Sequence, residues 1–189
     1  FDEKSDINIL TCGCSHTVGV GVNQHEAWPF VLKELVKKHT EKTVSIHNLA
    51  TSGASVDYVV RTVHKTIDIL NPDFVCVFWP PVVRVEMPSN ENDKAVTQSF
   101  LRDDNFPKNF VNKYWLQDYL FHKNLVLLQA LTTANKSKFI SNTVIESMVD
   151  DIDGDYFPAD STARDGLHPV PNWHKTGAEF YFKHINQHI

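Results

Sequence analysis

The sequence predicts an α/β protein in which helices cover both faces of a parallel sheet. Short apolar segments alternate with segments of helical periodicity, turn residues separate the two, and 42% of the 189 residues are hydrophobic. A chain of this length and apolar content can bury one complete core, so we expect a single domain over residues 1–189. Strands that alternate with helices pair in parallel, and right-handed crossovers bring their carboxyl ends to one edge of the sheet.

The first half of the chain carries the clearest alternation. Apolar or β-branched residues predict strands before Gly13, over residues 43–47 and over residues 74–79. Between them, apolar residues at helical spacing predict one helix that begins near Pro29 and a second over residues 56–70. The order strand–helix–strand–helix–strand is that of a sheet covered on both faces.

The second half is less regular. Residues 80–107 contain four prolines and little periodicity, which is typical of a functional loop or an insertion. We expect a helix over residues 109–135 with a break near Lys123–Asn124, a fourth strand over 138–141 and a short helix over 144–149. An acidic, turn-rich segment (150–164) then precedes a closing helix marked by apolar residues from Ala178 to Ile189.

Composition excludes several classes of protein. The chain has 18 Lys and Arg against 23 Asp and Glu, a net charge of −5, so we expect no nucleic-acid partner. No apolar run approaches the roughly 20 residues that a bilayer span needs, so no membrane insertion is expected. Three cysteines without CxxC spacing indicate reduced thiols. With no visible signal peptide, these features favour a cytoplasmic location.

The first candidate for chemistry is Ser15, which directly follows the first predicted strand. At the carboxyl end of a strand a serine hydroxyl can attack a carbonyl group while the serine's own backbone N–H faces the developing oxyanion. Read alone, a serine that caps the following segment is the more common explanation. Gly53, after the second strand, can likewise offer a backbone N–H to a ligand or simply permit a turn.

The third candidate segment contains Asp165 and His168 and precedes the closing helix. A carboxylate three residues before an imidazole can accept from Nδ1–H and leave Nε2 as a base, which is the orienter and base of a serine hydrolase. The alternatives are a turn-capping aspartate and a metal site built on His168 and His174. No third ligand has convincing spacing, so we expect no metal. Neither a GxGxxG motif nor a phosphate loop is present, and no cofactor is expected.

Together these segments resemble the sequence blocks of the SGNH (GDSL-type) hydrolases. Residues 9–17 are similar to the first block, with Gly-Cys-Ser where the family has Gly-Asp-Ser, and residues 48–55 resemble the second. Residues 165–169, Asp-Gly-Leu-His-Pro, match the final Asp-x-x-His-Pro block. The resemblance implies a three-layer α/β/α sandwich with a mainly parallel, five-stranded sheet of flavodoxin-like architecture.

The resemblance also implies ester hydrolysis through an acyl-enzyme. Ser15 would be the nucleophile, His168 the general base and Asp165 its orienter. The backbone N–H groups of Ser15 and Gly53 would form the oxyanion hole. We expect a small ester as substrate, such as an O-acetyl group on a carbohydrate. A non-catalytic binding module and an acyltransferase with the same triad remain alternatives, and the oligomeric state is open.

The chain departs from the family at the third block, Gly-x-Asn-Asp. Its asparagine should donate to the oxyanion after the third strand, but here Trp79 runs into Pro-Pro-Val-Val-Arg (residues 80–84), with no asparagine nearby. Losing one such donor typically costs about 3 kcal/mol of transition-state stabilisation. Arg84 is a candidate substitute donor or a binder of an anionic substrate group. Trp79 and Trp173 are candidates for lining an acyl or sugar pocket.

Overall fold

The computed structural model describes residues 5–88, 95–99, 114–143 and 162–189, and all structural statements refer to these residues. Its main sheet has four parallel strands in the order β2–β1–β3–β6. The strands are β1 (Ile7–Gly13), β2 (Val44–Asn48), β3 (Phe74–Trp79) and β6 (Lys138–Thr143). The chain therefore crosses over after β2, and the carboxyl ends of β1 and β3 flank the position where ligands bind in sheets of this type.

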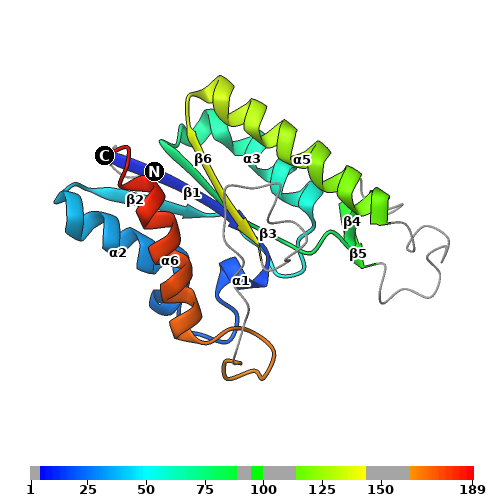
Figure 1. Ribbon diagram of the computed structural model, residues 1–189, viewed down its shortest axis with the longest axis horizontal. Coiled ribbons are helices and arrows are strands. Elements are labelled where there is room, and N and C mark those ends of the chain that lie inside the picture. The colour runs from blue at the N-terminus through cyan, green and yellow to red at the C-terminus, as the bar shows by residue number, and fades with distance from the viewer. Residues whose placement is uncertain (1–4, 89–94, 100–113, 144–161) are drawn as a thin grey trace.

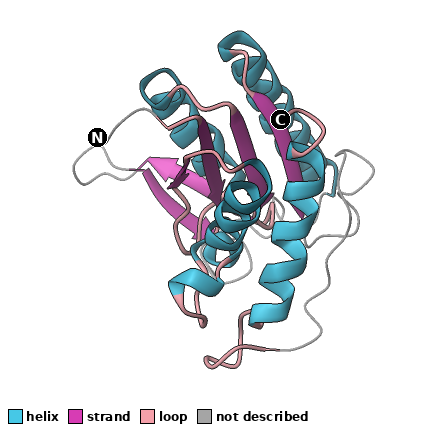
Figure 2. Ribbon diagram, turned by 90° about the vertical axis from the view of Figure 1, so that its left-hand side faces the viewer, coloured by secondary structure: helices cyan, strands magenta, loops and turns pink. Residues whose placement is uncertain are grey.

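Two helical layers cover the sheet (Figures 1 and 2). On one face lie α2 (Trp28–Thr40) and α6 (Pro171–Ile185), and on the other lie α3 (Val56–Leu70) and α5 (Tyr114–Asn135). Two short helices, α1 (Ser15–Val18) and a 3₁₀ turn (Gln24–Glu26), connect β1 to α2. The three-layer α/β/α prediction is confirmed.

Each face of the sheet has its own apolar core because successive side chains of a strand point to opposite faces. In β3, Phe74, Cys76 and Phe78 pack with α2 and α6, whereas Val75 and Val77 pack with α3 and α5. All six residues of β3 are buried, as expected for a central strand covered on both sides. Tyr181 of α6 donates its buried hydroxyl to the Val77 carbonyl at 2.7 Å and so ties helix to sheet.

Helix α6 runs back from the carboxyl edge of the sheet to its amino edge. It begins three residues after His168, and its last residue, Ile185, packs in the same cluster as Ile7 at the start of β1. Figure 1 accordingly shows the start of β1 and the end of α6 on the side of the sheet away from α1.

The prediction of five strands is wrong, because four strands form the sheet. No fifth parallel strand enters it after Thr143 in the described residues. Residues 162–169 make only an isolated bridge, Thr162 to Pro169, before α6 begins.

The segment predicted to be irregular contains a hairpin. Strands β4 (Arg84–Pro88) and β5 (Ala95–Ser99) pair antiparallel and form a separate two-stranded sheet. The sequence pattern did not predict this hairpin because prolines interrupt the alternation of a strand. Pro88 lies at the end of its strand, where a missing N–H is tolerated.

The helices also differ in detail from the prediction. Helix α5 is continuous past Lys123, so the predicted break there is wrong. Asn124 lies inside this helix, and its amide donates to the Leu120 carbonyl oxygen one turn back and to Asp57 of α3. The closing helix starts at Pro171, earlier than its apolar pattern indicated. The predicted helix over 144–149, and most of the acidic segment over 150–164, lie outside the described residues.

Candidate active site

Ser15 lies at the junction of β1 and α1, at the carboxyl end of the first strand, as predicted. Cys14 is extended (φ −106°, ψ −153°), and Ser15 is the first residue of the helix and is 7% exposed. Gly13 makes the junction possible: a Cβ there would lie 2.3 Å from Thr17 Oγ1 and 2.6 Å from the Phe78 carbonyl oxygen. The backbone of β1 can approach β3 this closely only at a glycine.

The Asp165–His168 pair forms within one loop. Asp165 Oδ2 bonds to His168 Nδ1, and Oδ1 accepts from the backbone N–H groups of His168 (3.0 Å) and Leu167 (3.1 Å). These bonds, that to the His168 side chain above all, lower the pKa of Asp165 to about 2. With Nδ1 facing a carboxylate, the neutral imidazole carries its proton there and keeps Nε2 as a base.

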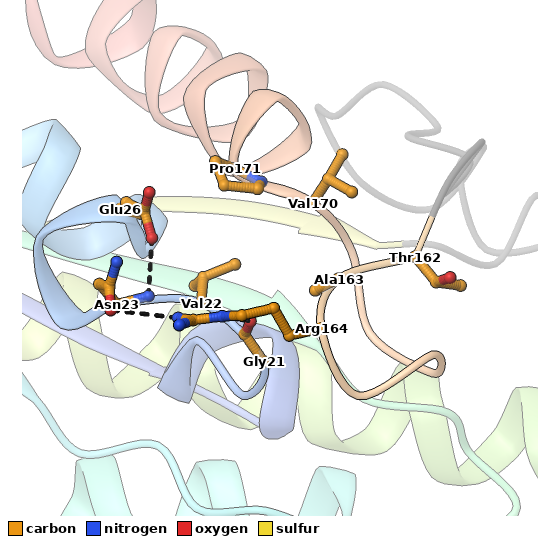
Figure 3. Close-up of a pocket in the computed structure, with 9 residues that line it drawn as sticks. All are labelled: Gly21, Val22, Asn23, Glu26, Thr162, Ala163, Arg164, Val170 and Pro171. Atoms are coloured by element: carbon orange, nitrogen blue, oxygen red, sulfur yellow. Dashed lines mark hydrogen bonds between the residues drawn. The ribbon is translucent and has the colours of Figure 1, made fainter.

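A second loop holds this pair in place. Gly21, after α1, has φ +87°, and a Cβ on it would lie 2.9 Å from Ala163 Cβ and 3.0 Å from Asp165 Oδ1. Arg164 adds hydrogen bonds to the Gly21 carbonyl oxygen (3.3 Å) and to Asn23 Oδ1 (3.1 Å), as Figure 3 shows. The segment that follows Ser15 therefore packs against, and hydrogen-bonds to, the loop that contains His168, the candidate base.

Between these two loops lies a pocket of about 540 Å³ (Figure 3). Its lining comes from residues 21–23, 26, 162–164, 170 and 171. Neither Ser15 nor His168 contributes to this lining.

His16 connects the candidate nucleophile and base, and the sequence analysis missed it. Its ring centroid lies 5.8 Å from that of His168, 5.6 Å from Trp173 and 6.0 Å from Phe78. Burial, aided by the charge of Arg84, lowers the pKa of His16 to about 4, so the ring is neutral at pH 7. The first and last blocks thus meet through an aromatic cluster. No periodicity marks such a residue; its only signal is its place beside the serine.

The second block, residues 48–55, lies at the same edge of the sheet as Ser15. Thr51 N–H donates to the Gly13 carbonyl oxygen at 3.3 Å, and Asn48 Nδ2 donates to the Thr17 carbonyl oxygen at 3.0 Å. Gly53 is exposed with φ +78°, a conformation that favours glycine, and nothing lies within 4 Å of where its Cβ would be. Among the described residues, no acceptor takes the backbone N–H of Ser15 or Gly53.

The three candidate substrate-binding residues lie in different surroundings. Arg84, at the start of β4, donates from Nη1 to the Ala54 carbonyl oxygen at 3.4 Å and so lies beside the second block. Trp173 packs against His16 and Phe78 and is 8% exposed. Trp79 is fully buried in the α3–α5 core against Phe121, and the structure does not bring it to the site.

A buried asparagine does occur at this edge, but on another strand. Asn142 pairs in register with Phe78, and its Nδ2 has no partner among the described residues. It shares the strand face of Ile140, which packs on the α6 side, whereas Gly53 precedes α3 on the other side.

His174, weighed as a metal ligand with His168, is fully buried. Its Nδ1 accepts from the Trp28 backbone N–H at 3.3 Å. In the described part of the chain, no group of three His, Cys, Asp or Glu side chains is arranged to hold a metal ion. The three cysteines, Cys12, Cys14 and Cys76, are buried and form no disulfide.

Substituting Gly21 tests the support of the base. We expect Gly21→Ala to lower kcat for an ester about tenfold or more, because the new Cβ displaces Asp165, and displacements of about 1 Å at a site have large effects. Gly166→Ala is the matched control: its φ is +69°, so it carries the same backbone penalty, but nothing lies within 4 Å of its Cβ. Steady-state kinetics on both variants check this, and equal losses would show that only backbone strain matters.

The fold is that of the SGNH (GDSL-type) hydrolases. No family model and no curated protein matches the sequence, so this statement rests on solved structures. Of the helices in the described residues, none has the length and hydropathy needed to cross a bilayer.

Three solved structures illustrate the likeness. The psychrotrophic esterase EstA from Pseudoalteromonas sp., inhibited by monoethylphosphonate, is 15% identical with a TM-score of 0.61, over 96% of this chain and 98% of that one. The acetyl-xylooligosaccharide esterase Axe2 from a Geobacillus is 13% identical, with a TM-score of 0.63 over 98% and 96%. A carbohydrate esterase whose active site "displays divergent catalytic and non-catalytic binding functions" is 16% identical, with a TM-score of 0.61 over 99% and 67%.

Proposed function

We propose that this protein is a serine esterase that hydrolyses small esters through Ser15, His168 and Asp165. The observation that carries the proposal is the Asp165–His168 pair, anchored on the loop that follows Ser15 and in ring contact with the residue next to it. A carboxylate-bound imidazole and a serine at the carboxyl end of a strand, on segments linked by these contacts, are the groups that an acyl-transfer site needs.

The reaction follows from these groups. His168 Nε2 takes the Ser15 hydroxyl proton as Oγ bonds to the ester carbonyl carbon, and the carbonyl oxygen becomes an oxyanion. The backbone N–H groups of Ser15 and Gly53 donate to that oxyanion. The C–O bond to the alcohol then breaks, His168 returns the proton to the leaving oxygen, and an acyl-Ser15 ester remains. Water, deprotonated by the same imidazole, hydrolyses this ester and regenerates Ser15.

We also propose an O-acetyl group on a carbohydrate as the physiological ester. Support comes from the two carbohydrate-directed esterases among the similar structures and from Trp173, whose apolar ring borders the site. Acetate release from acetylated xylo-oligosaccharides, compared with release from phenyl acetate, measures this preference.

Covalent labelling tests the esterase proposal. A fluorophosphonate reacts only with an activated serine, so we expect one adduct, located on Ser15 by peptide mass spectrometry. Ser15→Ala should not label, whereas Ser45→Ala, which changes a serine on β2, should label like the wild type. Absence of an adduct on the wild type would instead favour a binding module, which the missing third-block asparagine makes the second candidate.

A further inference from the structure

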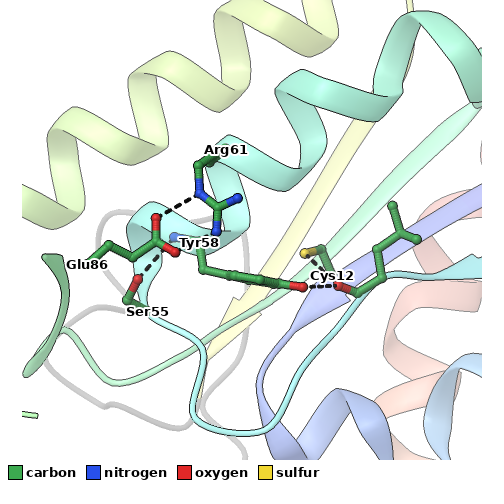
Figure 4. A network of polar contacts seen from close by, with 6 residues as sticks. Cys12, Ser55, Tyr58, Arg61 and Glu86 are labelled. Carbon is green, nitrogen blue, oxygen red and sulfur yellow. Dashed lines mark hydrogen bonds and ion pairs between the residues drawn. The ribbon is translucent and has the colours of Figure 1, made fainter. Parts of the chain in front are cut away.

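Two arginines near the site differ in their partners. Arg61 of α3 forms two hydrogen bonds with Glu86, Nε to Oε2 at 2.9 Å and Nη2 to Oε1 at 2.6 Å (Figure 4). Arg84 lies two residues before Glu86 on the same face of β4. Its guanidinium makes one hydrogen bond with the described residues, the 3.4 Å bond to Ala54, and no carboxylate among them pairs with it. Arg61 is thus neutralised, and Arg84 is not.

The unpaired guanidinium lies beside the second block of the candidate site. Ala54, its hydrogen-bond acceptor, follows Gly53 of the proposed oxyanion hole. The charge of Arg84 also contributes to the low pKa of His16, the residue after Ser15. Arg84 is half-buried, so water screens its charge less than that of a surface arginine.

The donor geometry indicates what this group binds. A guanidinium presents five N–H donors in a planar fork that matches the two oxygens of a carboxylate. One donor is used on Ala54, so four remain in the described surroundings. A tetrahedral oxyanion presents one charged oxygen to a guanidinium. A carboxylate presents two oxygens and can accept from two guanidinium N–H groups at once.

We propose that Arg84 binds a carboxylate of the substrate, so that the preferred esters carry a negative charge close to the scissile bond. This inference rests on the proposed esterase function and narrows its substrate class to esters that carry a carboxylate; for an O-acetyl group on a carbohydrate, the carboxylate would belong to an acidic sugar. Arg84 then acts as a specificity-determining residue.

Two pairs of esters that differ mainly in charge test the proposal. The pair 4-acetoxybenzoate and 4-acetoxybenzamide places the charge on the alcohol side, and the monoester 4-nitrophenyl adipate and 4-nitrophenyl hexanoate place it on the acyl side. We expect the wild type to favour the anionic ester of at least one pair about tenfold or more in kcat/KM, mainly through KM. In Arg84→Gln this ratio should fall to about one.

Arg61→Gln is the matched control, because it removes the same charge from the neighbouring, paired position and should keep the preference. The proposal is overturned by a wild type without preference, by an Arg84→Gln that keeps it, or by an Arg61→Gln that loses it equally. An equal fall in kcat for charged and neutral esters in Arg84→Gln leaves the ratio unchanged and would assign Arg84 to the oxyanion hole instead.

A binding measurement separates this inference from the function itself. If the wild type hydrolyses no ester, the esterase proposal fails, and calorimetric titration with 4-acetoxybenzoate and 4-acetoxybenzamide then tests Arg84 alone. Tighter binding of the carboxylate by tenfold or more, lost in Arg84→Gln and kept in Arg61→Gln, supports the anion site. Equal or undetectable binding of both compounds overturns it.

Discussion

Replacing Ser15 with alanine is expected to lower kcat for an aryl acetate by a factor on the order of 10⁶, and His168→Ala by a similar factor. In the proposed reaction the two side chains act in one step, since the hydroxyl is a weak nucleophile until the imidazole takes its proton. The double variant should therefore be little slower than either single variant. Stopped assays with phenyl acetate at high enzyme concentration can follow the residual rates.

His64→Ala provides a control for the histidine substitution, because His64 is exposed on α3, and its rate should equal that of the wild type. Equal rates in the wild type, Ser15→Ala and His168→Ala would show that the triad is not used.

Asp165→Asn should reduce kcat by a factor on the order of 10⁴, because an amide can stabilise the wrong tautomer of the imidazole. Since the pKa of Asp165 is about 2, this carboxylate stays ionised throughout the range in which imidazoles titrate. Any loss of activity between pH 7 and pH 5 must then come from protonation of a base, not of Asp165. Asp68→Asn, an exposed substitution on α3, should leave the rate and its pH profile unchanged.

Acid should destabilise the fold through its buried imidazoles. His174 is fully buried, and burial lowers its pKa from 6.5 to about 4, with His16, Glu26 and His168 as the charged or titratable groups that act on it. Between those two values the unfolded chain binds a proton that the folded one does not, so the free energy of unfolding falls as the pH drops from 6.5 to 4. The slope is about 1.4 kcal/mol per pH unit for each such histidine, or on the order of 3 kcal/mol across the window. His16, with a pKa of about 4, adds a similar contribution.

His174→Gln tests this contribution while keeping an acceptor for the Trp28 N–H. Urea unfolding at pH 7, 6 and 5 should show a shallower loss of stability in His174→Gln than in the wild type, even if the variant is less stable at pH 7. His64→Gln changes an exposed imidazole and should retain the wild-type slope. If His174→Gln and the wild type lost stability in parallel, the buried imidazole would not be the cause.

The fold was predictable because the elements that form the sheet have strong local patterns. The helix over Val56–Leu70 agrees with the predicted bounds, since its five buried positions follow the spacing of one helix face and Ser55 caps its N-terminus. The strand Phe74–Trp79 was equally clear, because burial on both sides requires a continuous apolar run.

The sequence-based predictions were wrong where tertiary contacts outweigh the local sequence pattern. The hairpin of β4 and β5 is tied to α3 by the hydrogen bonds between Arg61 and Glu86. No local sequence pattern predicts that these two residues pair. The strand number was taken from a resemblance and not from the residues. Helix α5 continues through Asn124, whose amide contacts the preceding turn and Asp57 of α3, and no local pattern shows these contacts.

The residues of the candidate site likewise divide into those whose contacts the sequence predicts and those whose contacts it does not. The pairing of Asp165 with His168 was predictable because both residues lie in one short loop. The bridging role of His16 and the burial of Trp79 were not, since each depends on which side chains the fold brings around it.

The path of α6 has a practical consequence. Because β1 starts and α6 ends at the amino edge of the sheet, Ile7 and Ile185 share one cluster on the far side of the molecule from Ser15. An affinity handle or surface attachment joined beyond either residue leaves the edge that carries Ser15 open, even to a polymeric ester. The proximity of these two positions also makes the chain suited to circular permutation, in which a short linker joins them and new ends are cut elsewhere.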